Sequence, residues 1–236
     1  MTTPRLLALL DWDGTLRKGY TIVPWVHHLT RAGVLAGTCN ADLSDLFQRY
    51  GAGEISHDEL ARLTARVYAQ HLRGQRRAMI KVQARRFVRE DQSKLFRFSR
   101  DLLVGLRALK IRPVIISGAP IEILDAYREV LDLEEVYGLE LGVLRGQFTG
   151  EVRRNPGMAR VKQHIVRIIA RAPRSQVRVA MGDPPSDEPL LRAAQVPIFV
   201  ESSKRSADTC EVSIRPTTSA ERILDIMVNA VREVDH

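Results

Sequence analysis

The stretch LLALLDWDGTLRKGY, residues 6–20, begins as an apolar run and ends in charged and turn-forming residues. Residues 6–10 are apolar at every position, which is typical of a short strand buried on both faces of a parallel sheet. Asp11 and Asp13 follow this run directly. Because two like charges at the end of a buried strand repel each other and resist desolvation, we expect a positive group between them, with a metal ion as the first choice.

The sequence from residue 18 to residue 91 shows helical patterns without an intervening strand pattern. Apolar residues recur at i, i+3 and i+4 spacing in residues 21–34, 41–53 and 56–72. Ser56 and Glu59 form a capping-box pattern at the start of the third of these segments. We therefore predict a small helical domain inserted after the first strand, at residues 18–95, and a core domain built from residues 1–17 and 96–236.

Strand and helix patterns alternate through the rest of the chain. Strands are predicted at residues 112–118, 176–183, 197–200 and 211–214, and a hairpin at 136–152. Helices are predicted at 94–109, 121–133, 159–172, 187–195 and from Ser219, with Thr218 and Glu221 as a capping box for the last one. This alternation predicts an α/β fold with a doubly wound parallel sheet, in which ligands bind beyond the carboxyl ends of the strands.

Polar residues follow three of the predicted strands and therefore meet at one rim of the sheet. These residues are Asp11, Asp13, Ser117, Gly118, Asp183 and Asp187. Carboxylates and backbone carbonyls are the oxygen ligands that Mg²⁺ prefers. A carboxylate beside such an ion can attack phosphorus to form an aspartyl-phosphate, and a second one can protonate the leaving oxygen. With a serine hydroxyl, backbone amides and a lysine to bind phosphoryl oxygens, the rim is suited to phosphoryl transfer.

Four sequence motifs occur in an order that resembles a known family. DWDGT, IISGAP, Lys162 in ARVKQHI, and MGDPPSD resemble the four motifs of the haloacid dehalogenase superfamily of phosphohydrolases. The helical insert and the segment LRGQFTGEV resemble the phosphoserine-phosphatase-like branch, in which a small helical cap covers a Rossmann-like core. The resemblance implies Mg²⁺-dependent hydrolysis of a phosphate monoester of a small metabolite through an aspartyl-phosphate.

The resemblance also implies a role for each motif residue. Asp11 would be the nucleophile and Asp13 the general acid and base. Mg²⁺ would be held by Asp11, the backbone carbonyl of Asp13, and Asp183, with Asp187 supporting them from a second position. Ser117 and Lys162 would bind the phosphoryl group, and Arg160 is a rival of Lys162. The remaining residues assigned to phosphate binding are Thr15, which would shape the first loop, and Gly118.

Two residues of the insert bear on substrate choice. Tyr20 stands where phosphoserine-specific members carry a glutamate that binds the substrate ammonium, and a tyrosine cannot supply that charge. Arg62 lies near the place where the branch keeps an arginine for the substrate carboxylate. We assign both to substrate binding and expect phosphoserine to be a poor substrate beside a phosphorylated metabolite with a further anionic or hydroxylated group.

The charge of the chain leaves other functions open. The formal net charge is +8, and residues 73–112 hold thirteen basic residues against three acidic ones. Such a run is more often a solvated helix face than a nucleic-acid surface. The alternatives are phosphotransfer to an acceptor hydroxyl, and a nucleic-acid-binding protein that uses the basic insert beside a vestigial site. We rank nucleic acid below a small metabolite as the partner, and the oligomeric state stays open.

The sequence also predicts the compartment. An apolar run of about 18 residues, as a membrane span requires, is lacking, and the start has no signal-peptide pattern. Cys39 and Cys210 are far apart in sequence and from any histidine cluster, which argues against disulfides or a zinc site. We therefore expect a cytoplasmic protein without a membrane partner.

Overall fold

The structure, a computed structural model, describes residues 4–183, 186–201 and 212–234 of the 236-residue chain. Within these residues one seven-stranded sheet has the order β4-β3-β2-β1-β5-β6-β7. β1 lies at its centre and pairs in parallel with β2 and with β5. The strands are β1 (Arg5–Leu10), β2 (Ile111–Pro120), β3 (Glu135–Leu144), β4 (Gln147–Arg154), β5 (Ser175–Gly182), β6 (Val196–Val200) and β7 (Val212–Ile214).

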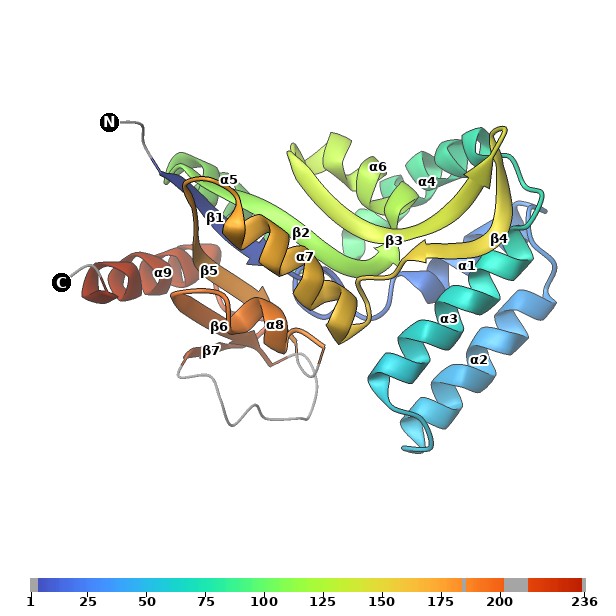
Figure 1. The fold of residues 1–236 in the computed structure, drawn as a ribbon, viewed down its shortest axis with the longest axis horizontal. Helices are drawn as coiled ribbons and strands as arrows, with labels where there is room; N and C mark the ends of the chain where they lie inside the picture. The colour runs from blue at the N-terminus through green and yellow to red at the C-terminus, as the bar shows by residue number, and fades with distance from the viewer. Residues whose placement is uncertain (1–3, 184–185, 202–211, 235–236) are drawn as a thin grey trace.

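Helices cover both faces of the sheet, as Figure 1 shows. Successive residues of a strand point to opposite faces, so Leu7 and Leu9 pack in the cluster that contains α7 and α8. Ala8 and Leu10 pack on the other side, with α5, α6 and α9. The predicted doubly wound α/β fold is confirmed. The helices of this core are α5 (Ser99–Ala108), α6 (Ile121–Leu131), α7 (Ala159–Arg171), α8 (Glu188–Leu191) and α9 (Ala220–Val234).

Four helices and a short 3-10 turn lie between β1 and α5, where the sequence predicted a helical insert. The Ser56 side chain accepts a hydrogen bond from the Glu59 amide at 3.2 Å and caps the third helix as predicted. In Figure 1, α2 and α3 run side by side beyond the sheet, and α4 lies near α6. These elements are α1 (Ile22–Arg31), α2 (Thr38–Gly51), α3 (His57–Leu72), α4 (Arg77–Asp91) and η1 (Gln92–Lys94).

The predicted hairpin is formed by β3 and β4. Its two turn residues, Arg145 and Gly146, both have positive φ, 49° and 78°, which suits the twist of a two-residue hairpin. The first half of β3 pairs with β2, and its second half pairs with β4. β4 then packs against α3, so the hairpin connects the sheet to the helical insert.

One predicted helix start and one predicted helix cap were wrong. The helix predicted from residue 94 begins at Ser99, because the preceding segment bonds to the loop after β1 through the Phe96 amide and the carbonyl of Leu16. The last helix is capped by Ser219, whose hydroxyl accepts from the amide of Arg222 at 3.2 Å. The hydroxyl of Thr218 accepts instead from the amide of Arg215, so the predicted capping box does not form.

Candidate active site

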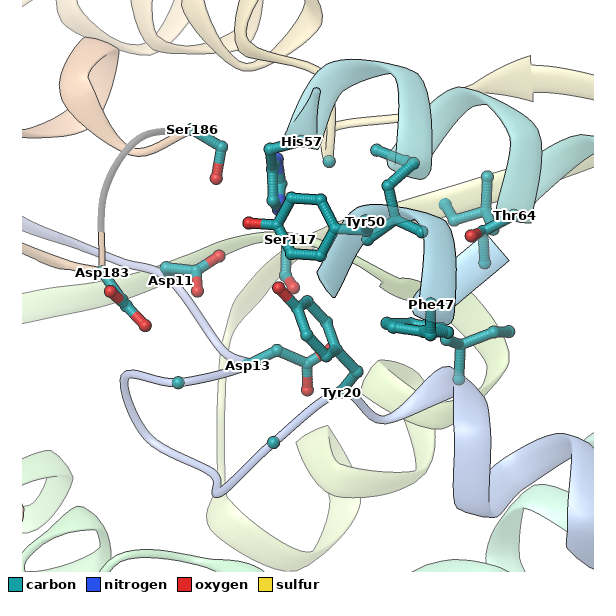
Figure 2. A pocket seen from close by; sticks show the side chains of 18 of the residues that line it. Asp11, Asp13, Tyr20, Phe47, Tyr50, His57, Thr64, Ser117, Asp183 and Ser186 are labelled. Atoms are coloured by element: carbon teal, nitrogen blue, oxygen red, sulfur yellow. The ribbon is translucent and has the colours of Figure 1, made fainter. Parts of the chain in front are cut away.

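A cavity of about 690 Å³ lies between the carboxyl ends of the central strands and the helices of the insert. Figure 2 shows Asp11, Asp13 and Asp183 on one side of it and the side chains of the insert on the other. The core contributes six of the sequence-predicted residues to its lining: Asp11, Asp13, Ser117, Gly118, Lys162 and Asp183. Strand ends that are far apart in sequence thus meet where the carboxyl-end rule places them.

Lys162 lies between two buried carboxylates. Its ammonium nitrogen is 3.0 Å from Asp11 Oδ1 and also hydrogen-bonds to Asp187. Asp187 in turn accepts from the backbone amide of Asp183 at 2.7 Å. Arg160 is exposed on the first turn of α7, so Lys162 is the basic residue of α7 that reaches the strand ends.

Burial and charge set the protonation of this group. Burial alone would lower the pKa of Lys162, but Asp11 and Asp187 outweigh it and raise that pKa, so the ammonium stays charged. Burial and the neighbouring Asp187 raise the pKa of Asp11, while Lys162 opposes the rise. A single lysine therefore does not neutralise the carboxylates here, and a further cation would favour the ionised form of Asp11.

Asp13 is held in place by Thr21, the residue before α1. Its carboxylate accepts from the amide of Thr21 at 3.0 Å and from the Thr21 hydroxyl. Burial raises the pKa of Asp13 to about 6, although Arg17 and the Thr21 bonds oppose the rise. A carboxyl group with this pKa exists in both protonation states near neutral pH, as a general acid and base requires.

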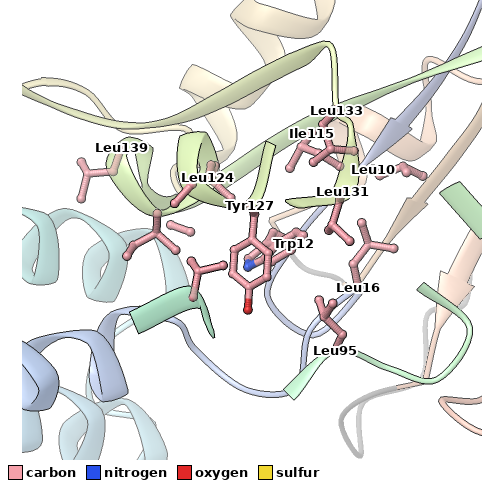
Figure 3. Close-up of a cluster of buried hydrophobic side chains, with 14 of the residues drawn as sticks. Leu10, Trp12, Leu16, Leu95, Ile115, Leu124, Tyr127, Leu131, Leu133 and Leu139 are labelled. Carbon is pink, nitrogen blue, oxygen red and sulfur yellow. The ribbon is translucent and has the colours of Figure 1, made fainter. Parts of the chain in front are cut away.

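The loop between Asp13 and the insert is fixed by a buried ion pair. The Arg17 guanidinium donates twice to Asp91 at the end of α4, with distances of 2.8 and 2.6 Å. Asp91 also accepts from the Tyr127 hydroxyl at 2.7 Å. The Tyr127 ring packs on Trp12, with ring centroids 4.5 Å apart, inside a cluster of leucines (Figure 3). The position of the first loop therefore depends on contacts with both the insert and α6.

Ser117 and Gly118 lie near the carboxyl end of β2. The Ser117 hydroxyl is buried and accepts from the amide of Ala119 at 3.2 Å. A Cβ added at Gly118 would lie 2.8 Å from the backbone of Gly157, so only glycine allows these two segments to approach each other. The backbone around Gly118 consequently lines the cavity directly.

The donor set at the rim fits a hard cation. The acidic side chains of Asp11 and Asp183 and the backbone carbonyl of Asp13 are all oxygen donors beside one cavity. The described residues contain no cluster of three or more acidic, histidine or cysteine side chains that could enclose a metal ion. Two carboxylates and a carbonyl leave room for water and a substrate oxygen, which is how Mg²⁺ is commonly bound.

Two predicted ligand-binding residues lie outside the cavity lining. Thr15 is fully buried behind the first loop, and its hydroxyl has no hydrogen-bond partner among the described residues. Arg62 is exposed and pairs with Glu59 at 3.3 Å. On α3 the side chains of Leu60, Ala61 and Thr64 line the cavity, and helix periodicity turns residue 62 away from that face. Arg62 therefore does not line this cavity, and its assignment to substrate binding stays a prediction without support from the structure. Tyr20 does line the cavity.

The sequence did not identify several cavity residues. Phe47 and Tyr50 of α2, His57 at the start of α3, and Asn155 after β4 all contribute to the lining. Residues 57, 60, 61 and 64 do share one helix face in the sequence, but a face of that kind could equally pack in a core. Burial lowers the pKa of His57, so its ring is neutral near pH 7.

Two hydrogen bonds fasten α3 to the core beside the cavity. The Asn155 side-chain amide donates to the carbonyl of Ala61 at 2.8 Å. Asp58 accepts from the amide of Ala159 at 3.0 Å, at the N-terminus of the helix that carries Lys162. The insert is therefore tied to the segment that positions the buried lysine.

The basic run of residues 73–112 is partly neutralised by acidic residues that lie outside it in sequence. Arg77 pairs with Glu122 at 2.9 Å, and Arg85 donates twice to Glu129. Both glutamates belong to α6, against which α4 packs. The net positive charge of the surface around this run is therefore smaller than the sequence of the run alone suggests.

Comparison with known proteins gives both a family and a fold. The family model for haloacid dehalogenase-like hydrolases matches residues 8–192. A phospho-aspartyl intermediate analogue of phosphoserine phosphatase is 18% identical, with a TM-score of 0.67 over 94% of this chain and 99% of that one. A substrate-bound phosphoserine phosphatase is 17% identical, with a TM-score of 0.66 over 95% and 98% of the two chains.

A third solved structure carries no functional description. A protein of unknown function from Bordetella pertussis Tohama I is 21% identical, with a TM-score of 0.69 over 86% of this chain and 92% of its own. At such identities the structural likeness shows the fold alone. No curated protein sequence matches this chain significantly. Separately, the part of the chain that the structure describes contains no helix that is both long and apolar enough to cross a membrane.

Proposed function

This chain belongs to the haloacid dehalogenase-like hydrolase family, and from that premise we propose that it hydrolyses phosphate monoesters through a phosphoryl group carried on Asp11. The observation that carries the proposal is the position of the buried Lys162, 3.0 Å from Asp11 at the end of β1. A carboxylate so placed, beside a fixed positive charge and a cavity, can attack a phosphoryl group that the lysine also binds.

The reaction has two steps. In the first, an oxygen of Asp11 forms a bond to phosphorus while the bond to the alcohol oxygen breaks, and Asp13 gives that oxygen a proton. In the second, Asp13 takes a proton from water, whose oxygen attacks the same phosphorus and releases Asp11. Ser117 and the amides around Gly118 donate to the phosphoryl oxygens throughout. Asp187 keeps Lys162 and the chain at Asp183 in position.

We assign the oxygen donors of Asp11, Asp183 and the Asp13 carbonyl to Mg²⁺. When bound, the ion supplies positive charge that favours ionised Asp11 and stabilises the charge of the transferring phosphoryl group. Removal of the ion with a chelator should therefore abolish turnover, and Mg²⁺ should restore it. Ca²⁺ should restore it poorly because its longer and more variable coordination misplaces the nucleophile.

The insert, residues 18–95, is proposed to act as the cap that selects a small phosphorylated metabolite. Tyr20 lines the cavity where an ammonium group would need a negative charge, so phosphoserine should be a poor substrate. The cap also covers the strand ends and limits access of water to the phosphoryl group.

The test is the variant Asp11→Asn, assayed with p-nitrophenyl phosphate and Mg²⁺. The variant should fold and lose on the order of 10³-fold or more in kcat, because an amide is a poor nucleophile. Asp42→Asn is the matched control, since Asp42 is an exposed carboxylate that pairs with His71 away from the cavity. A folded Asp11→Asn variant with near-native kcat would contradict the proposed mechanism.

Phosphotransfer to an acceptor hydroxyl is the second candidate, because the same phosphoryl group could pass to an alcohol. Adding glycerol to the assay distinguishes the two reactions. Hydrolysis releases one inorganic phosphate for each alcohol, whereas transfer releases less phosphate than alcohol.

A further inference from the structure

The cavity has two chemically different halves. Its core half carries Asp11, Asp13, Asp183 and Lys162. Among the described lining residues of the insert, Lys18 is the one charged side chain, since the His57 ring is neutral. Lys18 is exposed, and its nitrogen lies 5.9 Å from the centre of the Phe96 ring. The rest of the insert's lining is apolar, aromatic or neutral and polar. Charge in this cavity is therefore concentrated where the phosphoryl group would bind.

Aromatic rings form much of the wall of the insert. Tyr20 packs against Phe47 with ring centroids 5.0 Å apart, and Tyr50 lies near His57 with centroids 6.0 Å apart. Figure 2 shows Tyr20 and Tyr50 reaching from the insert toward the side of the cavity that holds Asp11. Surfaces of this kind bind flat apolar groups through ring stacking and burial of apolar area.

The nearby charged residues of the insert are used elsewhere. Asp58 accepts from the amide of Ala159, and Glu59 pairs with Arg62 on the outer face of α3. Glu54 lies 3.6 Å from Arg49. An ammonium group of a substrate would lose its water against this wall without gaining a partner of opposite charge, and Lys18 at the exposed edge of the wall is the cation that a carboxylate could meet.

Two neutral polar residues, Thr64 and His57, belong to the wall of the insert. The Thr64 hydroxyl and the Nδ1 atom of His57 are buried and have no hydrogen-bond partner among the described residues. Both residues line the cavity. Because these polar atoms are covered by protein, the surface that the two residues offer to the cavity is uncharged.

The cavity also has room for more than a phosphoryl group. Its 690 Å³ falls within the range of about 300–1,000 Å³ that is typical of sites for small organic ligands. Space beyond the phosphoryl group is therefore available for a ring.

We infer that the substrate is the phosphate monoester of an uncharged alcohol that contains an aromatic or other flat apolar group, held between the rings of the insert. This inference rests on the proposed function. It makes Phe47, Tyr50 and His57 specificity-determining residues of the cap, and it favours an apolar group over the further anionic or hydroxylated group expected from sequence.

The experiment compares kcat/KM for three alkyl phosphates with similar leaving alcohols: ethyl phosphate, phosphoserine and 2-phenylethyl phosphate. We expect 2-phenylethyl phosphate to exceed ethyl phosphate by roughly 10- to 100-fold, the effect of burying one aromatic ring. Phosphoserine should not exceed ethyl phosphate. Phe47→Ala and Tyr50→Ala should each reduce the ratio of 2-phenylethyl to ethyl phosphate by at least about threefold.

Tyr137→Ala is the matched control, since Tyr137 is an aromatic residue that lies beside Arg154 and does not line this cavity. That variant should leave the ratio unchanged. A ratio near one, or phosphoserine as the best of the three esters, would overturn the inference while leaving the phosphatase proposal standing. Absence of turnover with all three esters and with p-nitrophenyl phosphate would overturn the proposed function, and the inference with it.

Discussion

Lys162 shows how much a single buried charge decides in this protein. Its side chain is 1% exposed, and its nitrogen contacts both Asp11 and Asp187. The two carboxylates therefore share one cation. An isolated lysine in α7 would be taken for a solvated helix charge from sequence alone. The surrounding motif predicted that Lys162 lies in the active site. In the structure Lys162 contacts Asp11, whereas Arg160 is exposed.

Replacing Lys162 should therefore affect both stability and activity. Lys162→Met leaves two buried carboxylates without a positive partner, and we expect the free energy of unfolding to fall by about 3–5 kcal/mol. Turnover should be lost as well, because the phosphoryl group loses its fixed cation. Urea unfolding at pH 7 measures the first effect, with Lys81→Met on the exposed face of α4 as the control. A stability equal to that of the parent protein would show that the ion pair is not formed.

Asp13 makes a pH prediction with a definite sign. With a pKa of about 6, its carboxyl group is protonated below that pH and ionised above it. Cleavage of an alkyl phosphate needs the protonated form, whereas nitrophenolate leaves without a proton. The ratio of kcat/KM for ethyl phosphate to that for p-nitrophenyl phosphate should thus fall by about tenfold per pH unit above about pH 6.

Taking the ratio removes effects that the two esters share, such as metal binding. The measurement is a series of initial rates at saturating Mg²⁺ from about pH 5 to about pH 8. A ratio that stays constant over this interval would contradict the assignment of Asp13 as the general acid.

At the scale of elements, α3 is the part of the insert that joins the cavity to the core. Its first turn places His57 in the cavity lining. The same turn carries Asp58, which accepts a hydrogen bond from the amide of Ala159 at the N-terminus of α7. Asn155 fastens the next turn through the carbonyl of Ala61. Movement of α3 would therefore change both the cavity wall and the surroundings of Lys162.

Loosening this attachment should weaken catalysis. Asp58→Ala removes the carboxylate that caps α7, and loss of such a cap typically costs about 0.5–2 kcal/mol. We expect hydrogen exchange in the first turns of α3 and α7 to quicken and KM to rise several-fold. Asp45→Ala, an exposed carboxylate on α2 that lies 3.9 Å from Arg49, is the control. Unchanged exchange in both helices would show that the contact does not hold the cap.

The elements themselves were largely predictable from sequence, because periodicity reports which faces are apolar. The buried run of β1 and the stripes of α3 and α7 gave the correct element types. Helix boundaries were less predictable: α5 begins at Ser99 because Phe96 bonds to Leu16, which is remote in sequence. Periodicity also cannot say which partner a helix face meets, and for that reason the cavity residues of α2 and the outward direction of Arg62 were missed.

On the scale of the whole molecule, the strand ends and the family match lead to the same assignment. The carboxyl-end rule brought Asp11, Ser117 and Asp183 together from sequence, because it follows from topology alone. The predicted superfamily is confirmed by the family model over residues 8–192. The roles of these residues and the boundary of the cap at residues 18–95 stay predictions. Cys210 and residues 184–185 of the last motif lie outside the described residues, while Cys39 is buried and free.

The distribution of charge over the molecule predicts weak binding to nucleic acids. Glutamates of α6 pair with Arg77 and Arg85, so fewer cations of the run are available for phosphates. We expect fluorescence anisotropy to detect at most weak, sequence-independent binding that declines steeply as salt rises. Submicromolar, sequence-dependent binding at about 150 mM salt would reverse our ranking of metabolite over nucleic acid.

The central claim is that phosphorus becomes bonded to Asp11 during turnover, and trapping that bond tests it most directly. The protein is mixed with p-nitrophenyl phosphate and Mg²⁺, quenched in acid and reduced with borohydride, which converts an acyl phosphate to an alcohol and leaves free carboxylates unchanged. Peptide mass spectrometry should then find the reduced side chain at residue 11 and nowhere else, in an amount that depends on substrate. Turnover with an unmodified Asp11, or with the reduced side chain at Asp13 or Asp183, would contradict the account.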